Sequence, residues 1–329
     1  MYKKTRSMIP AFLMLALAAG ASAQTGTDVQ DYPSRPVKVI VAAASGSSPD
    51  AIARRIANEL GTQWKQPVVI ENAVGLGGVI GAEKAATHDP DGYTLLVSTI
   101  GAMSVSGSLM DLPYDPVKDF EPVTLAMSMP NLLVVHPSVP VKTLGELLAY
   151  AKENPNKLRY GHPGIGTTPH LSAELLKDMT GVQMQAIPYK SSAQMATDLI
   201  AGHYEVLFHN SSVMLPHVQS GNATPLAVTG VERVKTLPDV PTVAEAADLK
   251  GFSVNAWWGI YVPAGTPPEL VAKLNADITA ALKKPEIKEW VEAQGGTVGA
   301  GTQEDLRQHQ ADEAKKWGDL IKKANIQAD

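Results

Sequence analysis

The sequence predicts an α/β fold of two domains, each with a mainly parallel sheet flanked by helices. Short apolar runs alternate with amphipathic helical patterns, which is typical of parallel sheets covered by helices. At 329 residues the chain is long enough to form two hydrophobic cores. Two similar apolar strands, at 132–137 and 259–263, both stop at a proline and lead into a helix. We expect them to be the paired crossings between the domains.

Residues 1–23 have the features of a secretory signal peptide. Three basic residues precede an apolar run at 8–19, which is too short to span a bilayer, and a small-residue cleavage motif ends at Ala23. An uncleaved anchor is the alternative. Removing 23 of the 329 residues leaves 306, and because three positive charges leave with them, the net charge changes from −5 to −8. That charge, without a cluster of Lys or Arg, argues against a nucleic-acid partner.

The chain contains no cysteine. Disulfides, thiol catalysis and thiolate metal sites are therefore excluded, as is a lipid anchor on cysteine. An exported protein with these properties is expected in the periplasm, with secretion from the cell as the alternative. We expect a monomer without a cofactor.

The first part of the chain alternates regularly between strand and helix patterns. A strand at 37–41 is followed by a loop of small residues and a helix from Pro49, with Ser48 as its cap and Asp50 in its first turn. Gly61 is expected to end this helix. Next come a strand at 67–70, a glycine turn at 75–78, a helix at 79–87, a strand at 93–97 and a proline-bounded connector at 114–122.

A second α/β series follows and is expected to form an inserted domain at 129–255. The first domain then comprises residues 24–128 and 256–329. The expected helices of the second series lie at 143–153, 169–179, 192–201 and 211–220, and its strands at 132–135, 158–161, 184–189, 204–209 and 225–229. A strand at 256–262 and a mostly helical tail from Pro267 complete the chain.

The loop at 164–170 is small, rich in hydroxyl groups and free of fixed charge. Thr168 is suited to cap the helix that follows, and Pro169 to be its first residue. Backbone N–H groups at a helix start bind anions at the positive end of the helix dipole. Similar loops occur at 42–48, 75–78, 98–104 and 209–212, all expected at carboxyl ends of strands, where open α/β sheets bind ligands.

Other functional motifs are weak or absent. The glycines from Gly75 to Gly81 superficially match a dinucleotide fingerprint, but no acidic residue follows at the required place, so a tight turn is favoured. The histidines are scattered, so no metal site is expected. Gly-x-Ser-x-Gly is absent, and the serines at 45–48 are better suited to donate to an anion than to act as nucleophiles. We expect no catalytic residue.

Several longer motifs resemble the Bug family, the periplasmic solute-binding proteins of tripartite tricarboxylate transporters. The similarity covers nearly all of residues 32–329. The motifs lie at 32–36, 67–72, 89–96, 112–120, 164–171, 188–190, 237–242 and 263–267.

The resemblance implies a two-domain clamshell of the periplasmic-binding-protein type, similar to type II. Such a protein closes on a small carboxylate and delivers it to membrane permease subunits, without catalysis. The ligand is held by loop amides, hydroxyl groups and ordered water. The ligand-binding residues implied in this chain are Ser45, Gly46, Ser47, Ser48, Ser98, Thr99, Ser104, Gly166, Thr167, Thr168, His170, Tyr189, Lys190, Ser191, His209 and Asn210.

Two departures from the family pattern affect the expected ligand. The first loop lacks the usual proline-rich Gly-Gly sequence, and His209-Asn210 stands where the family usually has Asp-Asn. Exchanging an acid for a histidine removes negative charge from the cleft, so we hypothesise a second ligand carboxylate, as in terephthalate. Two other functions stay open at this point: a ligand-binding partner of a membrane sensor kinase, and an exported serine hydrolase.

Overall fold

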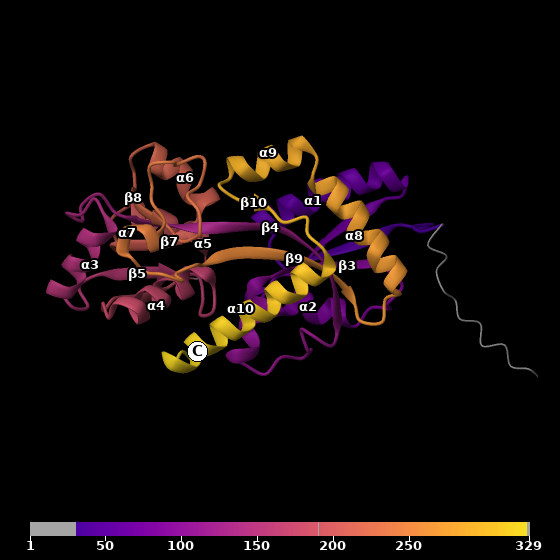
Figure 1. Cartoon of the computed structure of the whole chain (residues 1–329), viewed down its shortest axis with the longest axis horizontal. Coiled ribbons are helices and arrows are strands. Elements are labelled where there is room, and N and C mark those ends of the chain that lie inside the picture. The colour runs from indigo at the N-terminus through magenta and orange to yellow at the C-terminus, as the bar shows by residue number, and fades with distance from the viewer. Residues whose placement is uncertain (1–30, 190, 328–329) are drawn as a thin grey trace, which may run out of the picture.

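The computed structural model describes residues 31–189 and 191–327, which form two lobes joined by long neighbouring strands (Figure 1). The predicted α/β fold is confirmed, with helices flanking a mixed sheet. The strand order is β2-β1-β3-β9-β4-β7-β5-β6, and β8 and β10 also pair with β4. The predicted signal peptide lies outside the described residues.

The first lobe is built on parallel pairing of β1 with β2 and β3, and β9 runs antiparallel between β3 and β4. Alternate side chains of β1 enter different cores: Val39 packs with α1, α8 and α9, and Ile40 with α2 and α10. The elements are β1 (Val37–Val41), α1 (Ser48–Trp64), β2 (Val68–Asn72), η1 (Leu76–Gly78), α2 (Val79–Ala86), β3 (Thr94–Thr99), η2 (Gly101–Val105), η3 (Ser106–Ser108), β9 (Asn255–Pro263), α8 (Pro268–Leu282), α9 (Pro285–Ala293), β10 (Thr297–Val298) and α10 (Gln303–Lys323).

The second lobe has parallel pairing of β5 with β6 and β7, while β7 and β8 run antiparallel to β4. One face packs against α3, α4 and α7 and the other against α5 and α6. The elements are β4 (Phe120–Val135), α3 (Leu144–Glu153), β5 (Arg159–His162), α4 (Thr168–Thr180), β6 (Gln185–Pro188), α5 (Ser192–Ile200), β7 (Val206–Asn210), α6 (Ser211–Gln219), β8 (Thr224–Val228) and α7 (Val243–Ala247).

Strand β4 belongs to both lobes. Residues Phe120 to Pro130 pair with β9, and from Asn131 onward the strand pairs with β7 and β8. The change of partners falls between Pro130 and Asn131, two residues after the boundary predicted at 128/129, and the domain boundaries stay a prediction.

Several sequence expectations about element ends are wrong. Helix α1 begins at Ser48 with Ser47 as its N-cap, one residue before the expected cap. The connector expected at 114–122 already contains the start of β4, because prolines at 122 and 130 resemble strand ends but are accommodated in the strand. The register shift after Pro122 shows how a residue without an N–H is tolerated there. Helix α1 continues past Gly61 to Trp64, and Lys65 ends it in the left-handed conformation.

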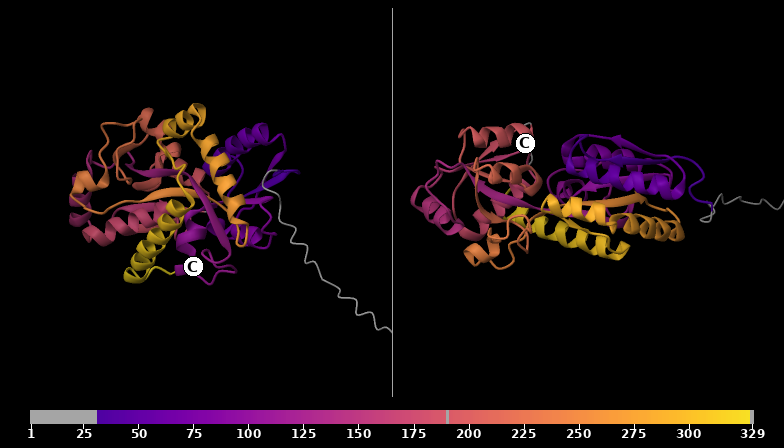
Figure 2. Two further views of the ribbon diagram at one scale, coloured as in Figure 1. Left: turned by 45° about the vertical axis from the view of Figure 1, so that its right-hand side comes forward. Right: turned by 90° about the horizontal axis from the view of Figure 1, so that it is seen from above.

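Three contacts tie the lobes together away from the shared strands. The hydroxyl of Ser211 donates to the Gln294 carbonyl. Lys235 pairs with Glu292 at 3.0 Å. At the end of α10, Lys323 pairs with Asp178 of α4 at 2.7 Å, and Figures 1 and 2 show this helix reaching from one lobe to the other. Among the described helices, every one is too short or too polar to cross a membrane.

Candidate functional site

The start of α4 forms one wall of a cleft between the lobes. The loop between β5 and α4 turns sharply, with Gly164 and Gly166 at positive φ, and Thr167 occupies the N-cap position, one residue before the expected cap. The hydroxyl of Thr167 donates to the Gly164 carbonyl and makes no capping hydrogen bond to the helix. The cap side chain therefore leaves the N–H of Thr168, the first helical residue, to other acceptors such as an anion, whereas Pro169, the second, has no N–H.

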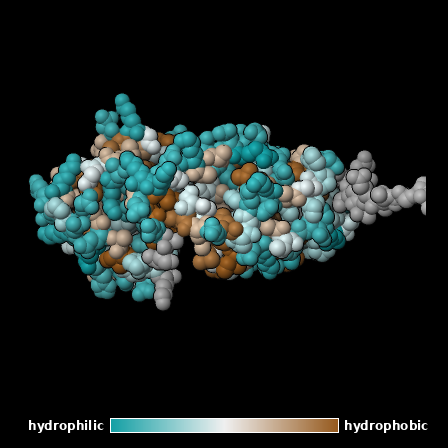
Figure 3. Space-filling view, turned by 90° about the horizontal axis from the view of Figure 1, so that it is seen from below, coloured by the Kyte–Doolittle hydropathy of each residue, from teal (hydrophilic) through white to brown (hydrophobic). Residues whose placement is uncertain are grey.

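The cleft has a volume of about 550 Å³ and is lined by both lobes. The first lobe supplies the η1 turn, the end of β3 and the segment through Met110, and β9 contributes residues 256–258. None of the described residues that line it carries a side chain with a fixed charge. An anion there would thus be held by backbone and side-chain dipoles. Seen from below, apolar surface gathers on both sides of the junction between the lobes (Figure 3).

His209 is the most unusual polar residue of the cleft. Its side chain is on β7, the residue is only 5% exposed, and neither ring nitrogen makes a hydrogen bond of acceptable geometry. Burial lowers the pKa of His209 from 6.5 to about 4, and the nearby Ser192 backbone acts in the opposite direction. The ring is therefore neutral at pH 7 and has an N–H that can donate to a ligand.

The structure brings together part of the predicted set. Six predicted residues line the cleft, and they come from three separate stretches of the chain. These residues are Thr99, Gly166, Thr167, Thr168, His209 and Asn210. Their role as ligand contacts stays a prediction.

The other predicted residues that the structure describes do not line this cleft. Ser98 is fully buried, and Ser104 donates to the Gln310 carbonyl beneath α10. His170 packs against the ring of His162, Tyr189 packs against Tyr204, and Ser191 caps α5. Lys190 lies outside the described residues. Ser45, Gly46 and Ser47 form the turn before α1, and Ser48 is the first residue of that helix.

The cleft also contains apolar residues that were not predicted as ligand contacts. Leu76, Leu109 and Met110 line its first-lobe wall, and Trp257 and Trp258 lie on β9. The loop at 75–78 was expected among the strand-end loops that bind ligands, but Leu76 itself was not predicted as a contact. The sequence feature that could have indicated a ligand contact at Leu76 is a large apolar residue within a glycine-rich turn.

The buried carboxylate of Asp50 organises the first loop. It accepts hydrogen bonds from the Gly46 amide at 2.8 Å, from Arg54 Nε at 2.9 Å and from Asn72 Nδ2 at 2.9 Å. Burial raises the pKa of Asp50, but the hydrogen bonds from Arg54, Gly46 and Asn72 outweigh it, so the pKa lies below the usual 3.8. This network fixes the loop 42–48 beside the cleft wall, since Ala42 lies against Gly78 and Gly81.

Replacing Asp50 by asparagine is expected to lower the free energy of unfolding at pH 7 by about 1–3 kcal/mol, because three donors lose a charged acceptor. Because the pKa of Asp50 is lower in the folded than in the unfolded protein, its ionised carboxylate stabilises the fold above about pH 4. This contribution to the free energy of unfolding is lost as the pH falls through the folded-state pKa. The difference from wild type should thus shrink below about pH 4 in denaturant titrations. Asp319→Asn, in an exposed ion pair with Lys315, is the control and should change little. A difference that is constant with pH would contradict this account.

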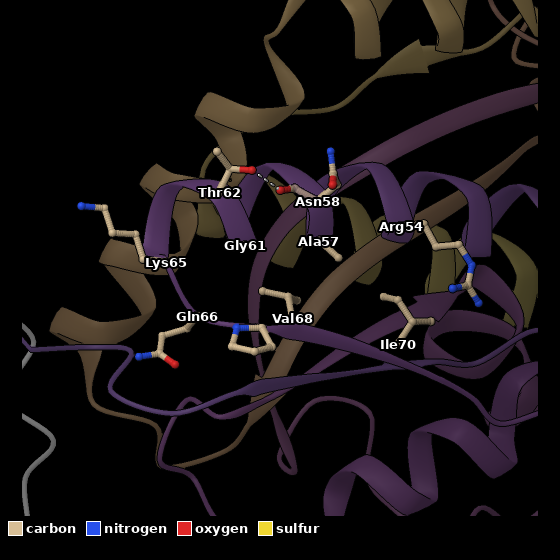
Figure 4. A pocket seen from close by; sticks show the side chains of 10 residues that line it. Arg54, Ala57, Asn58, Gly61, Thr62, Lys65, Gln66, Val68 and Ile70 are labelled. Carbon is tan, nitrogen blue, oxygen red and sulfur yellow. Dashed lines mark hydrogen bonds between the residues drawn. The ribbon is translucent and has the colours of Figure 1, made fainter.

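Two other hollows are weaker candidates. One of about 650 Å³ runs along α1 and β2 (Figure 4) and includes Arg54 and Lys65. Its residues come from the first lobe alone, and Arg54 is already bound to Asp50. The other, of about 480 Å³, contains Lys235 and Glu292, which pair with each other. Within the described residues, no three His, Asp or Glu side chains gather to hold a metal ion.

Known proteins are similar to this chain over most of its length. A family model described as "Tripartite tricarboxylate transporter family receptor" matches residues 52–326. The chain is 35% identical over 306 residues to protein BugT of Bordetella pertussis, covering 92% of this chain and 93% of that protein.

Solved structures are similar over almost the whole described chain. R. palustris Rpa4515 with adipate has 36% identity and a TM-score of 0.81, covering 90% of this chain and 99% of that chain. The periplasmic binding protein BugD has 34% identity and a TM-score of 0.78, with coverage of 90% and 99%. MatC from Rhodopseudomonas palustris with bound malate has 33% identity and a TM-score of 0.77, with coverage of 88% and 100%.

Proposed function

Because this chain belongs to the tripartite tricarboxylate transporter receptor family, whose members are periplasmic solute-binding proteins and not enzymes, we propose how it acts within that family. It captures a dicarboxylate in the cleft between its lobes and delivers it to the membrane permease of the transport system. Export after cleavage near Ala23, and a monomeric state, are parts of this proposal.

The observation that carries the proposal is the start of α4. The Thr167 side chain does not use the N–H of Thr168, and Thr168 lines the cleft shared by the two lobes. A carboxylate that accepts this N–H would gain from the helix dipole, without a cation on the described walls. Closure of the lobes would then shift an equilibrium between open and closed forms, and the permease would read the closed form.

The second carboxylate is assigned to the His209 end of the cleft. A neutral, buried imidazole can donate one N–H to an anion, which an aspartate at this position could not do. Adipate and malate, named with two similar structures, are both dicarboxylates. The tryptophans and leucines of this cleft support an aromatic body, as in terephthalate.

A thermal-shift screen followed by titration calorimetry tests the binding step. Dicarboxylates should raise the melting temperature more than the matching monocarboxylates, for example terephthalate more than benzoate. If none of the carboxylates raised the melting temperature, the proposal would be contradicted. Deleting the gene should abolish uptake of the ligand; intact uptake with lost gene induction would instead support a partner of a sensor kinase.

A further inference from the structure

Leu76 has a combination of features that folding alone does not favour. It is a non-glycine residue at φ 47°, and the residue is 61% exposed. Left-handed backbone is unfavourable for a residue with a Cβ, and an exposed leucine gains little from burial. Gly75, Gly77 and Gly78 around it have positive φ as well. A fourth glycine at position 76 would satisfy the turn with less strain.

The surrounding contacts hold Leu76 in this conformation. The Thr99 hydroxyl donates to the Gly77 carbonyl at 2.5 Å, which ties the turn to the end of β3. A Cβ at Gly78 would lie 2.7 Å from Thr99 Oγ1 and 3.3 Å from the Ala42 carbonyl oxygen, so the turn packs tightly there. Strained residues persist where neighbouring structure fixes them in this way, and they concentrate at functional sites.

Leu76 lies on the wall of the cleft between the lobes. It lines the first-lobe wall together with Met110, another exposed apolar residue, and with Leu109. Ile165 lines the same cleft from the loop before α4. The groups proposed to hold the two carboxylates lie elsewhere, at the start of α4 and at the end of β7, while the hydroxyl of Thr99 beside Leu76 is engaged by the Gly77 carbonyl. Leu76 is therefore placed to contact the body of a ligand whose two ends are polar.

We propose that Leu76 is a specificity-determining residue that selects carboxylates with an apolar body over compact hydroxylated ones. The assignment rests on the proposed function, since it needs a dicarboxylate in the cleft. A ligand that covers the exposed part of Leu76 gains roughly half the value of burying a leucine, which corresponds to about tenfold in affinity. A short acid with a hydroxyl on its chain has too little apolar surface to gain this.

The test measures selectivity in two variants. Leu76→Gly removes the side chain and relieves the backbone, and Leu76→Asn removes the apolar contact while tolerating the same φ. Affinities for terephthalate, adipate and malate are measured by titration calorimetry, directly or by displacement of the tightest ligand. Both variants should bind terephthalate and adipate about tenfold more weakly and malate within twofold of wild type. The melting temperature of unliganded Leu76→Gly should be unchanged or slightly higher.

The control is Val117→Ala, which truncates an apolar residue that is 65% exposed and does not line the cleft. It should leave all three affinities unchanged. Wild-type affinity for terephthalate in both Leu76 variants, or equal weakening for all three acids, would overturn the assignment of Leu76 while leaving the proposed function intact. A lower melting temperature of Leu76→Gly would show that Leu76 serves stability instead. A wild-type protein that binds none of the acids would defeat the proposed function itself.

Discussion

Gly166→Ala is expected to weaken dicarboxylate binding by about 10–100-fold, the largest effect among the cleft substitutions. Gly166 has φ 77°, and a Cβ there would lie 2.7 Å from Leu109 Cδ1 and 3.1 Å from Val105 Cγ1 of the opposite lobe. Leu109 can rotate its side chain away, but Val105 is buried and β-branched, and alanine is strained at this φ, so the loop is expected to shift and to move the Thr168 N–H with it. Titration calorimetry with terephthalate and adipate measures the loss.

The matched control lies at the other end of the same helix. Gly181 has nearly the same backbone, φ 73°, but a Cβ there meets nothing within 4 Å. Gly181→Ala should thus lower the free energy of unfolding by about 1 kcal/mol through backbone strain alone, with affinity unchanged. Equal loss of affinity in both variants would mean that strain, and not the contact between lobes, controls binding.

His209→Ala should weaken binding of dicarboxylates by about tenfold or more and leave monocarboxylates within about threefold of wild type. A hydrogen bond from a buried donor to a charged group contributes about 1.5–3 kcal/mol. A monocarboxylate held at the start of α4 makes no such hydrogen bond to His209, so its affinity should not depend on this residue. His203→Ala, at an exposed histidine outside the cleft, is the control. If mono- and dicarboxylate affinities were both unchanged, the second-carboxylate hypothesis would be wrong.

The same residue should give the unliganded protein a pH dependence. The pKa of His209 falls from 6.5 to about 4 on folding, so between these values the unfolded chain binds more protons than the folded one. The free energy of unfolding should therefore decrease as the pH falls from 6.5 to 4. His209→Ala should reduce this slope in denaturant titrations at several pH values, and an unchanged slope would contradict the burial of a neutral ring.

The local pattern of the sequence predicted most of the fold. Strands such as β1 and helices such as α4 are defined by neighbouring residues, so periodicity, caps and prolines were sufficient. Strand β4 was predicted too short because its prolines resemble strand ends, whereas a proline is tolerated where the pairing register shifts. The strands that pair with β4 are distant in sequence, so a local pattern does not reveal this register shift.

The candidate site was predicted only in part for a related reason. Thr167, Thr168 and His209 stand at strand ends and helix starts, which a sequence reveals. Leu76 and Met110 reach the same cleft only because the two lobes face each other, and that arrangement depends on the crossing of β4 and β9.

A crystal structure of the protein with terephthalate or adipate tests the central claim most directly. The account expects the ligand between the lobes, with one carboxylate accepting the Thr168 N–H at the start of α4 and the other within hydrogen-bond distance of His209. Ligand bound instead in the hollow along α1 and β2, near Arg54 and Lys65, would contradict it. So would a ligand in the cleft whose carboxylates both point away from α4.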